Sequence, residues 1–272
     1  MTDPAVEWTA MLVIAAAAGG YGWALLRLTR RGNRWPVSRS LSAAAGFATL
    51  AAAMAPALAD SMDFRVHVVH HLLLTMLAPL LLALSAPVTL ALRTLPHRPR
   101  RLLLIVLHSR FARTVTFAPV ILALDVGGMY AYYLTPLFSL TMTPPWLHFA
   151  VHTHMFLAGC LLSWYLVGPD PAPRRPSTRV KIAVLFVAAG SHDLLAKLMY
   201  AEQLPEGAGT TQQLHDGAQI MFYGGDVIEL LLAVGVLTTW YARTGRAAAH
   251  ERRRTSPAGR QIIVDVPNAR LR

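Results

Sequence analysis

The chain consists of long apolar runs separated by short arginine-rich segments, and this alternation strongly limits what it can fold into. A helix that crosses a bilayer needs about 20 mostly apolar residues. Only 14% of the residues are charged and 54% are hydrophobic, whereas soluble domains carry about a quarter of their residues as charges. The pattern therefore predicts an all-α, polytopic transmembrane bundle rather than a soluble fold.

Seven apolar runs are long enough to cross a membrane. We expect spans at residues 6–28, 40–59, 67–92, 114–134, 146–167, 180–200 and 213–241. Together they form one predicted domain, residues 1–242, followed by a basic tail, residues 243–272, that we expect to be disordered. The single cysteine, Cys160, excludes a disulfide framework and a zinc site built on several thiolates.

Basic residues indicate the orientation of the bundle. All but two of the 25 lysines and arginines follow the first, third and fifth runs or lie in the tail; the exceptions are Arg65 and Lys197. Because cytoplasmic loops are enriched in basic residues, the amino terminus is predicted outside and the carboxyl terminus in the cytoplasm. The net charge of +11 then indicates contact between the tail and anionic lipid rather than nucleic-acid binding.

Eight of the eleven histidines lie near the predicted outer ends of the spans. Ionisable groups in a membrane usually face the bundle interior or a water-filled cavity. His67 and His71 are four residues apart and share one face of a helix, so they could bind one metal ion together. The same holds for His148 and His152. We therefore predict a metal site at His67, His71, His148 and His152.

Copper is the favoured metal for this site, because imidazoles and nearby methionine thioethers suit copper, especially Cu(I), although zinc is also compatible. Asp63 precedes His67 by four residues and could accept its second ring proton. Further candidates as ligands or as partners of ligands are Asp63, His70, His154, His192, His215, Asp216 and Met155.

Several charged residues are predicted deep within the spans. These are Asp125, Asp193, Lys197, Asp226 and Glu229. Asp193 and Lys197 are four residues apart and could form an ion pair. A carboxylate at this depth should be protonated, paired or part of a proton path, because its charged form is strongly disfavoured there.

No catalytic motif is visible in the sequence. The chain contains no His-Glu-x-x-His, no Gly-x-Ser-x-Gly and no Cys-x-x-Cys-His. A zinc hydrolase would need a general base near its ligands, and the residues between the paired histidines are apolar or histidine. We therefore expect a protein that is not an enzyme.

Three motifs, in order along the chain, resemble the CtaG family of cytochrome c oxidase (caa-type) assembly factors. The segment from His67 to Pro79, followed by Ala86-Pro87, is similar to the histidine-containing third helix of that family. The helix Leu147–His152 with the loop Gly168–Pro171, and the run Gly217–Asp226, are similar to its later motifs. The resemblance covers most of the chain.

The resemblance implies a multi-pass protein of the bacterial cytoplasmic membrane that helps to build the copper centre of a haem-copper oxidase. Its partner would be an oxidase subunit, and His67, His71, His148 and His152 would be copper ligands. Two alternatives stay open from the residues. One is a copper transporter across the membrane, and the other is a cytochrome b-like protein with a haem between histidines such as His71 and His152.

Overall fold

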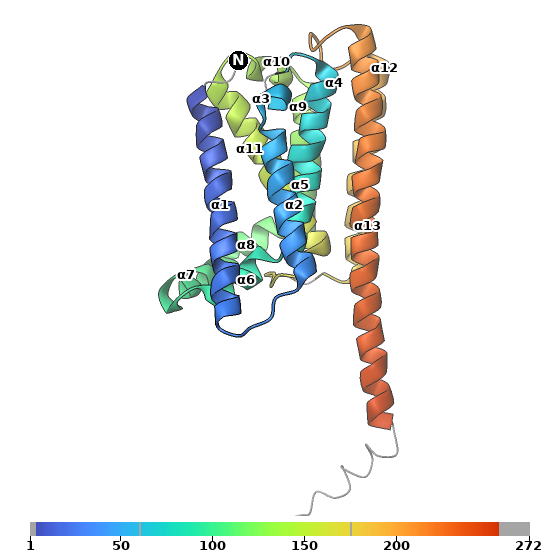
Figure 1. The fold of residues 1–272 in the computed structure, drawn as a ribbon. Helices are drawn as coiled ribbons and strands as arrows, with labels where there is room; N and C mark the ends of the chain where they lie inside the picture. Colours follow the sequence, from blue (N-terminus) through green and yellow to red (C-terminus); the bar gives the residue numbers. More distant parts are fainter. Residues whose placement is uncertain (1–3, 60, 175, 256–272) are drawn as a thin grey trace, which may run out of the picture.

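The computed structural model describes residues 4–59, 61–174 and 176–255, whose regular secondary structure is entirely helical. The helices stand side by side as a bundle (Figure 1). The longest are α1 (Pro4–Arg30), α11 (Pro145–Val167), α12 (Thr178–Glu202) and α13 (Thr211–Thr255). A composite helix joins α4 (Phe64–His71), the π-helix η1 (Leu72–Leu77) and α5 (Ala78–Leu84). The others are α2 (Val37–Ala53), α3 (Pro56–Ala59), α6 (Pro87–Thr94), α7 (His97–His108), α8 (Arg110–Val115), α9 (Ala118–Leu134) and α10 (Leu137–Thr141).

The predicted fold class, an all-α membrane bundle, is confirmed. A helix occupies most of each predicted span, and five helical segments are long and apolar enough to cross a membrane. These are Trp8–Arg30, Phe64–Leu84, Pro145–Val167, Thr178–Glu202 and Thr211–Ala242. Helix α9 is apolar but has 17 residues. The count of seven crossings and their direction stay predictions.

Prolines explain where the helices end earlier or begin later than predicted. The second predicted span stops at Ala53, shortly before Pro56, and the third stops at Leu84 instead of Leu92. After Leu84 the backbone turns at Ala86, whose φ is 56°, and a new helix begins at Pro87. Proline lacks the N–H that would continue the preceding helix but is well suited to a first helical turn.

The carboxyl-terminal helix is longer than predicted. Instead of giving way to a disordered tail at residue 243, α13 continues to Thr255 (Figure 1). The added segment is rich in alanine and arginine, which are strong helix formers. Residues 256–272 of the predicted tail lie outside the described residues.

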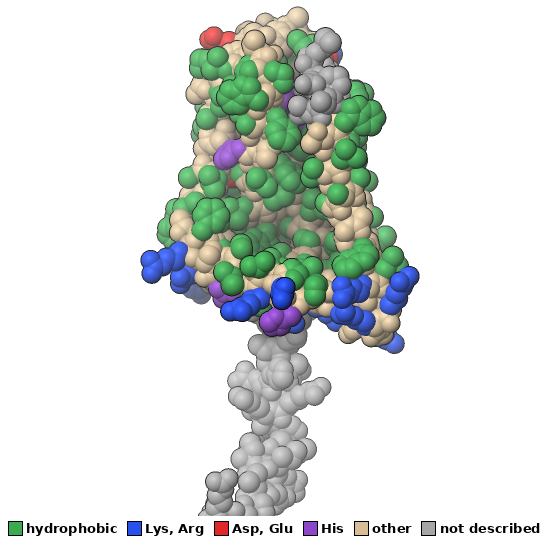
Figure 2. Space-filling model, turned by 90° about the vertical axis from the view of Figure 1, so that its left-hand side faces the viewer, with side chains coloured by type: hydrophobic (Ala, Val, Ile, Leu, Met, Phe, Trp, Pro, Cys, Tyr) green, Lys and Arg blue, Asp and Glu red, His purple; other side chains and the backbone are tan. Residues whose placement is uncertain are grey.

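Charge is distributed along the bundle as the sequence predicts. Figure 2 shows arginine and lysine side chains along the lower end of one face, below a largely hydrophobic surface. The helices α6, α7 and α8 lie at this same end (Figure 1). A basic end next to an apolar body is the arrangement expected of a helix bundle in a membrane.

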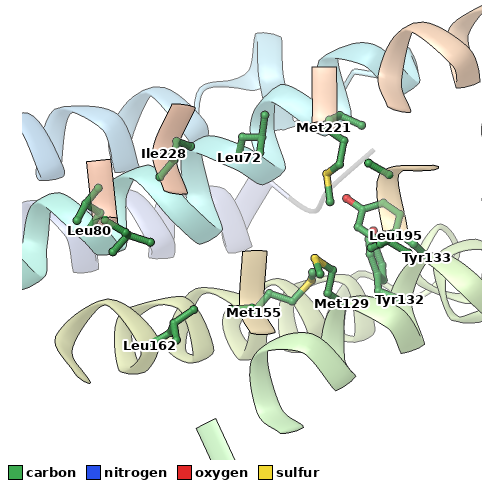
Figure 3. Packing of buried hydrophobic residues seen from close by; sticks show 14 of the residues in the cluster. Leu72, Leu80, Met129, Tyr132, Tyr133, Met155, Leu162, Leu195, Met221 and Ile228 are labelled. Atoms are coloured by element: carbon green, nitrogen blue, oxygen red, sulfur yellow. The ribbon is translucent and has the colours of Figure 1, made fainter. Parts of the chain in front are cut away.

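The core of the bundle lies between the composite helix, α9, α11, α12 and α13. Buried residues from all of these elements form one cluster, which includes Leu72, Tyr133, Leu162, Leu195 and Ile228. Figure 3 shows these side chains pointing toward one another between the helices. The packing fixes α4, α9 and α11 relative to one another and so positions the polar groups between them.

The π-helix η1 lies where α11 approaches the composite helix closely. Pro79 has no N–H, so the carbonyl of Thr75 lacks the donor that an α-helix would supply. Gly159 of α11 lies against this carbonyl, and a Cβ built at Gly159 would be 1.9 Å from the Thr75 oxygen. The lack of a side chain at Gly159 therefore lets the two helices approach closely.

A buried aspartate connects the loop after α11 to the start of α6. The carboxylate of Asp170, 7% exposed, accepts hydrogen bonds from the backbone N–H groups of Val88 (3.0 Å) and Thr89 (2.6 Å). It also accepts one from the Thr89 hydroxyl. A carboxylate at a helix amino terminus satisfies free N–H groups and is stabilised by the helix dipole.

We expect Asp170→Ala to lower the free energy of unfolding by about 3 kcal/mol, because two partly buried N–H groups lose a charged acceptor. Asp170→Asn should cost less, since an amide oxygen can still accept. Thermal unfolding in detergent would measure both. As a control, Ser109→Ala removes the partly buried cap of α8 and should cost about 1 kcal/mol. An Asp170→Ala protein as stable as wild type would show that the cap contributes little.

Candidate metal centre

Helix α4 carries three buried histidines. His67, His70 and His71 are 8%, 2% and 3% exposed. The helix starts where the side chain of Asp63 accepts a hydrogen bond from the backbone N–H of Arg65 (2.9 Å). A cap of this kind defines where a helix begins. Residues three apart on a helix share a face, so His67 and His70 point in similar directions.

Helix α11 places His152 against this face of α4. One ring nitrogen from each of His67, His70 and His152 lies within 4.8 Å of the other two. The ring centroid of His152 is 5.9 Å from that of His67 and 5.3 Å from that of His70. We call these three residues the histidine cluster. Three imidazoles that converge in this way suit a metal ion with three protein ligands.

The hydrogen bonds in the histidine cluster leave lone pairs for a ligand. A carbonyl oxygen can only accept, so the Nδ1–H of His152 donates to the His148 carbonyl (2.9 Å). The Nε2 of His152 then keeps its lone pair, and metal-bound histidines commonly have this arrangement. The Nε2 of His70 is buried and has no hydrogen-bond partner. A buried polar atom without a partner is costly unless a ligand satisfies it.

Aromatic rings enclose the histidine cluster. The ring centroids of Tyr132 and Phe138 lie 6.0 and 5.2 Å from that of His67. The hydroxyl of Tyr132 is 3.5 Å from the Nε2 of His67. The ring of His148 stacks on His152 with centroids 4.1 Å apart. This shell keeps water away, which strengthens electrostatic interactions inside it.

An apolar groove gives access to the histidine cluster from the side of the bundle. It has a volume of about 300 Å³ and lies between α1, α2 and α11. Val13, Leu50 and Phe156 line its apolar part, and His70 and His152 lie on its wall. The cluster can therefore be approached through this groove from the side of the bundle.

The predicted ligand His71 lies outside the histidine cluster. Its Nε2 is 3.3 Å from the Thr75 hydroxyl, and its ring centroid is 5.4 Å from that of Tyr133. His70, which we expected only as an additional candidate, is in the position that the prediction gave to His71. The i, i+3 spacing of His67 and His70 was visible in the sequence, but it did not distinguish the two neighbouring residues. The second predicted ligand pair, His148 and His152, is split as well, because His148 stacks on the cluster without joining it.

The predicted hydrogen bond from His67 to Asp63 does not form. The carboxylate of Asp63 instead accepts from the Arg65 guanidinium (2.6 Å), which lowers the pKa of Asp63 to about 2. Asp216 lies on the other side of the same guanidinium, 3.5 Å from it. His215 stacks on Tyr200 with centroids 4.2 Å apart. These residues link α4, α12 and α13 near one end of the bundle and are not members of the histidine cluster.

His154 and Lys197 also lie apart from the histidine cluster. The ring nitrogen Nε2 of His154 is 3.1 Å from the carbonyl oxygen of Leu124, on the seam between α9 and α11. The Nζ of Lys197 lies 5.2 Å from the ring centroid of Phe222. The predicted ion pair between Lys197 and Asp193 is not among the ion pairs of the described residues.

A second polar region lies deeper between the helices. A cavity of about 50 Å³ is lined by His71, Asp125, Met155, His192 and Glu229, among others. Figure 3 shows Met155 beside Met129, which lines the same cavity from α9. Carboxylate oxygens of Asp193, Asp226 and Glu229 lie within 4.8 Å of one another nearby. The deep carboxylates predicted from the sequence thus come from three helices and meet in one region.

Comparison with known proteins identifies the family. A family model described as "cytochrome c oxidase caa3 assembly factor" matches residues 19–243. Uncharacterized proteins of Mycobacterium bovis and Mycobacterium tuberculosis are each 30% identical over 93% of this chain, and one of Mycobacterium leprae is 28% identical over the same share. The chain spans 42% of the length of these relatives. No solved structure matches it. The chain belongs to the cytochrome c oxidase caa3 assembly factor family.

Proposed function

We propose that this protein binds one copper ion at the histidine cluster and presents it for assembly of a cytochrome c oxidase of the caa3 type. The observation that carries the proposal is the convergence of His67, His70 and His152 from two helices, with their ring nitrogens within 4.8 Å. The family supplies the context of oxidase assembly. Copper is the cargo in this proposal, and the protein's contribution is to hold it and give it up.

The donor set fits a copper ion that must be passed on. Neutral imidazole is a good ligand for copper, and also for zinc. Three protein ligands leave a coordination position open, so an acceptor group can bind the metal before the donor releases it. The buried Nε2 of His70 and the free lone pair on Nε2 of His152 are available for this role.

The acceptor in this proposal is an oxidase subunit in the same membrane. The apolar groove reaches His70 and His152 from the lipid side, so a membrane-embedded partner could approach the metal without crossing water. The basic segments at the other end of the bundle would hold the protein against anionic lipid headgroups.

A copper transporter is the second candidate, and the deep polar cavity beneath the histidine cluster favours it. Uptake of labelled copper into proteoliposomes separates holding from transport. We do not propose a haem site, because His71 faces the deep cavity and the rings of His70 and His152 are stacked only 5.3 Å apart. An iron–nitrogen bond of about 2 Å on each side of a haem would hold two axial rings farther apart.

The proposed function is tested in cells that depend on this protein for their oxidase. The variant His70→Ala/His152→Ala should give little assembled oxidase at limiting copper, and excess copper should restore part of it. The variant His154→Ala, whose ring lies on the α9–α11 seam, should assemble the oxidase normally. Normal assembly by the double variant at limiting copper, with equal protein levels by immunoblot, would contradict the proposal.

A further inference from the structure

Asp125, Asp193, Asp226 and Glu229 lie within the apolar helices α9, α12 and α13, away from the helix ends. Glu229 of α13 is within electrostatic range of Asp125, Asp193 and Asp226. Lys197 interacts electrostatically with Asp193, but its Nζ lies over the ring of Phe222. One ammonium group cannot balance four carboxylates in a membrane, where uncompensated charge is costly. Bound protons or a bound cation must therefore make up the difference.

Three of these carboxylates are arranged to share a ligand. One oxygen from each of Asp193, Asp226 and Glu229 lies within 4.8 Å of the others, although the residues come from two helices. Helices α12 and α13 run alongside one another, so this spacing follows from the main helix pair of the bundle (Figure 1). An acidic cluster alone does not define a metal site, and a second observation is needed.

The second observation is the imidazole of His192. Its side chain is buried, 3% exposed, and neither ring nitrogen has a hydrogen-bond partner. The Nδ1 points toward Glu229, 3.5 Å from Oε1, which is longer than a good hydrogen bond. Gly225 makes room for the ring, since a Cβ there would lie 2.1 Å from the Cε1 of His192. The fold thus holds an unsatisfied imidazole beside Glu229, one of the three carboxylates.

Space for a ligand is available next to these groups. His192 and Glu229 both line the deep cavity of about 50 Å³. A cavity of this size can hold an ion with one or more waters. His71 and Asp125 lie on the same cavity wall and could hold those waters. The region therefore combines negative charge, an available nitrogen and room for a small cation.

We propose that His192, Asp193, Asp226 and Glu229, here called the deep cluster, form a second cation site that binds a divalent transition-metal ion. A mixture of imidazole and carboxylate suits zinc, Cu(II) and similar first-row ions. Magnesium and calcium prefer oxygen ligands only, and Cu(I) prefers softer ones. A divalent cation would also offset part of the excess negative charge.

The deep cluster shares no residue with the histidine cluster, so the two proposals can fail separately. If both sites bind metal, the deep cluster could serve as a reservoir or as a step below the outer site. If only the outer site does, the carboxylates are balanced by protons alone. The experiment must therefore remove the histidine cluster and ask whether a metal still binds.

The test uses Co(II), whose visible absorption reports its ligands, on detergent-purified full-length protein carrying His70→Ala/His152→Ala. We expect this protein to bind about one Co(II) at neutral pH. Adding Glu229→Gln should lower the affinity by about 100-fold or more, since loss of an outer-shell partner alone costs 10–100-fold. Adding His192→Ala should do the same and change the absorption spectrum.

Glu202→Gln, at the end of α12 and exposed, is the matched control and should leave Co(II) binding unchanged. Thermal unfolding without metal identifies any variant that fails to fold, and Asp193→Asn then replaces it in the comparison. The proposal is overturned if the parent double variant binds no Co(II). Bound protons alone would then neutralise the carboxylates. It is also overturned if binding survives both Glu229→Gln and His192→Ala.

Discussion

Replacing His152 by alanine is expected to lower the affinity for Cu(I) by more than about 100-fold. Loss of a group that merely orients a ligand costs 10–100-fold, and loss of the ligand itself should cost more. His152 is the one member of the histidine cluster that α11 supplies, so its removal leaves only the two residues of α4. Competition with a coloured Cu(I) chelator in detergent measures the affinity directly.

The neighbouring histidine on the same helix provides the control. His154→Ala removes an imidazole two residues away that contacts the Leu124 carbonyl instead of the cluster. It should change the affinity by less than about twofold. His71→Ala gives a second comparison, because the sequence named His71 as a ligand whereas the structure places it at the deep cavity. Equal losses for His71→Ala and His152→Ala would show that the cluster is wrongly composed.

Replacing Gly159 by alanine is expected to destabilise the protein by about 3 kcal/mol. The new Cβ would lie 1.9 Å from the backbone oxygen of Thr75, and a backbone atom cannot swing aside as a flexible side chain can. Overpacking usually costs 1–3 kcal/mol, and this contact is at the upper end of that range. The close approach of α11 to η1 would be lost, and with it the position of His152 relative to α4. The temperature of thermal unfolding and the copper affinity should therefore both decrease.

Gly190→Ala tests the same chemical change where space is available. Nothing lies within 4 Å of a Cβ built at Gly190, which is in the middle of α12. Alanine favours a helix over glycine by up to about 1 kcal/mol, so this variant should be as stable as wild type or slightly more so. A Gly159→Ala protein that unfolds at the same temperature as Gly190→Ala would contradict the packing described for α11 and η1.

The helices could be predicted from sequence because one physical requirement determines them. An apolar run of about 20 residues has few other structures available to it in a membrane. Helix ends were predicted less well, because they depend on local backbone chemistry. The helix breaks after Leu84 because Ala86, just before Pro87, has a left-handed backbone conformation. The hydrophobic pattern of the sequence continues through this break and does not reveal it.

The segments that carry the candidate site were predicted from the sequence, but the particular histidines that form the cluster were not. Histidine-rich faces on the segments that became α4 and α11 were apparent from spacing. The choice between His70 and His71 depends on how α4 is rotated about its axis, which its packing partners set. Asp63 shows the same limit, because its nearest partner is Arg65 instead of the histidine four residues away. Contacts between helices, such as that of His192 with Glu229, cannot be deduced from the spacing of residues within either helix.

The most direct test of the copper site is the X-ray absorption spectrum of the full-length protein loaded with one equivalent of Cu(I). We expect two to three nitrogen neighbours at about 2.0 Å, with the outer-shell scattering typical of imidazole rings. In His67→Ala/His70→Ala/His152→Ala protein this signal should be absent. A shell dominated by sulfur at about 2.3 Å, or unchanged nitrogen scattering in the triple variant, would contradict the assignment of copper to these three histidines.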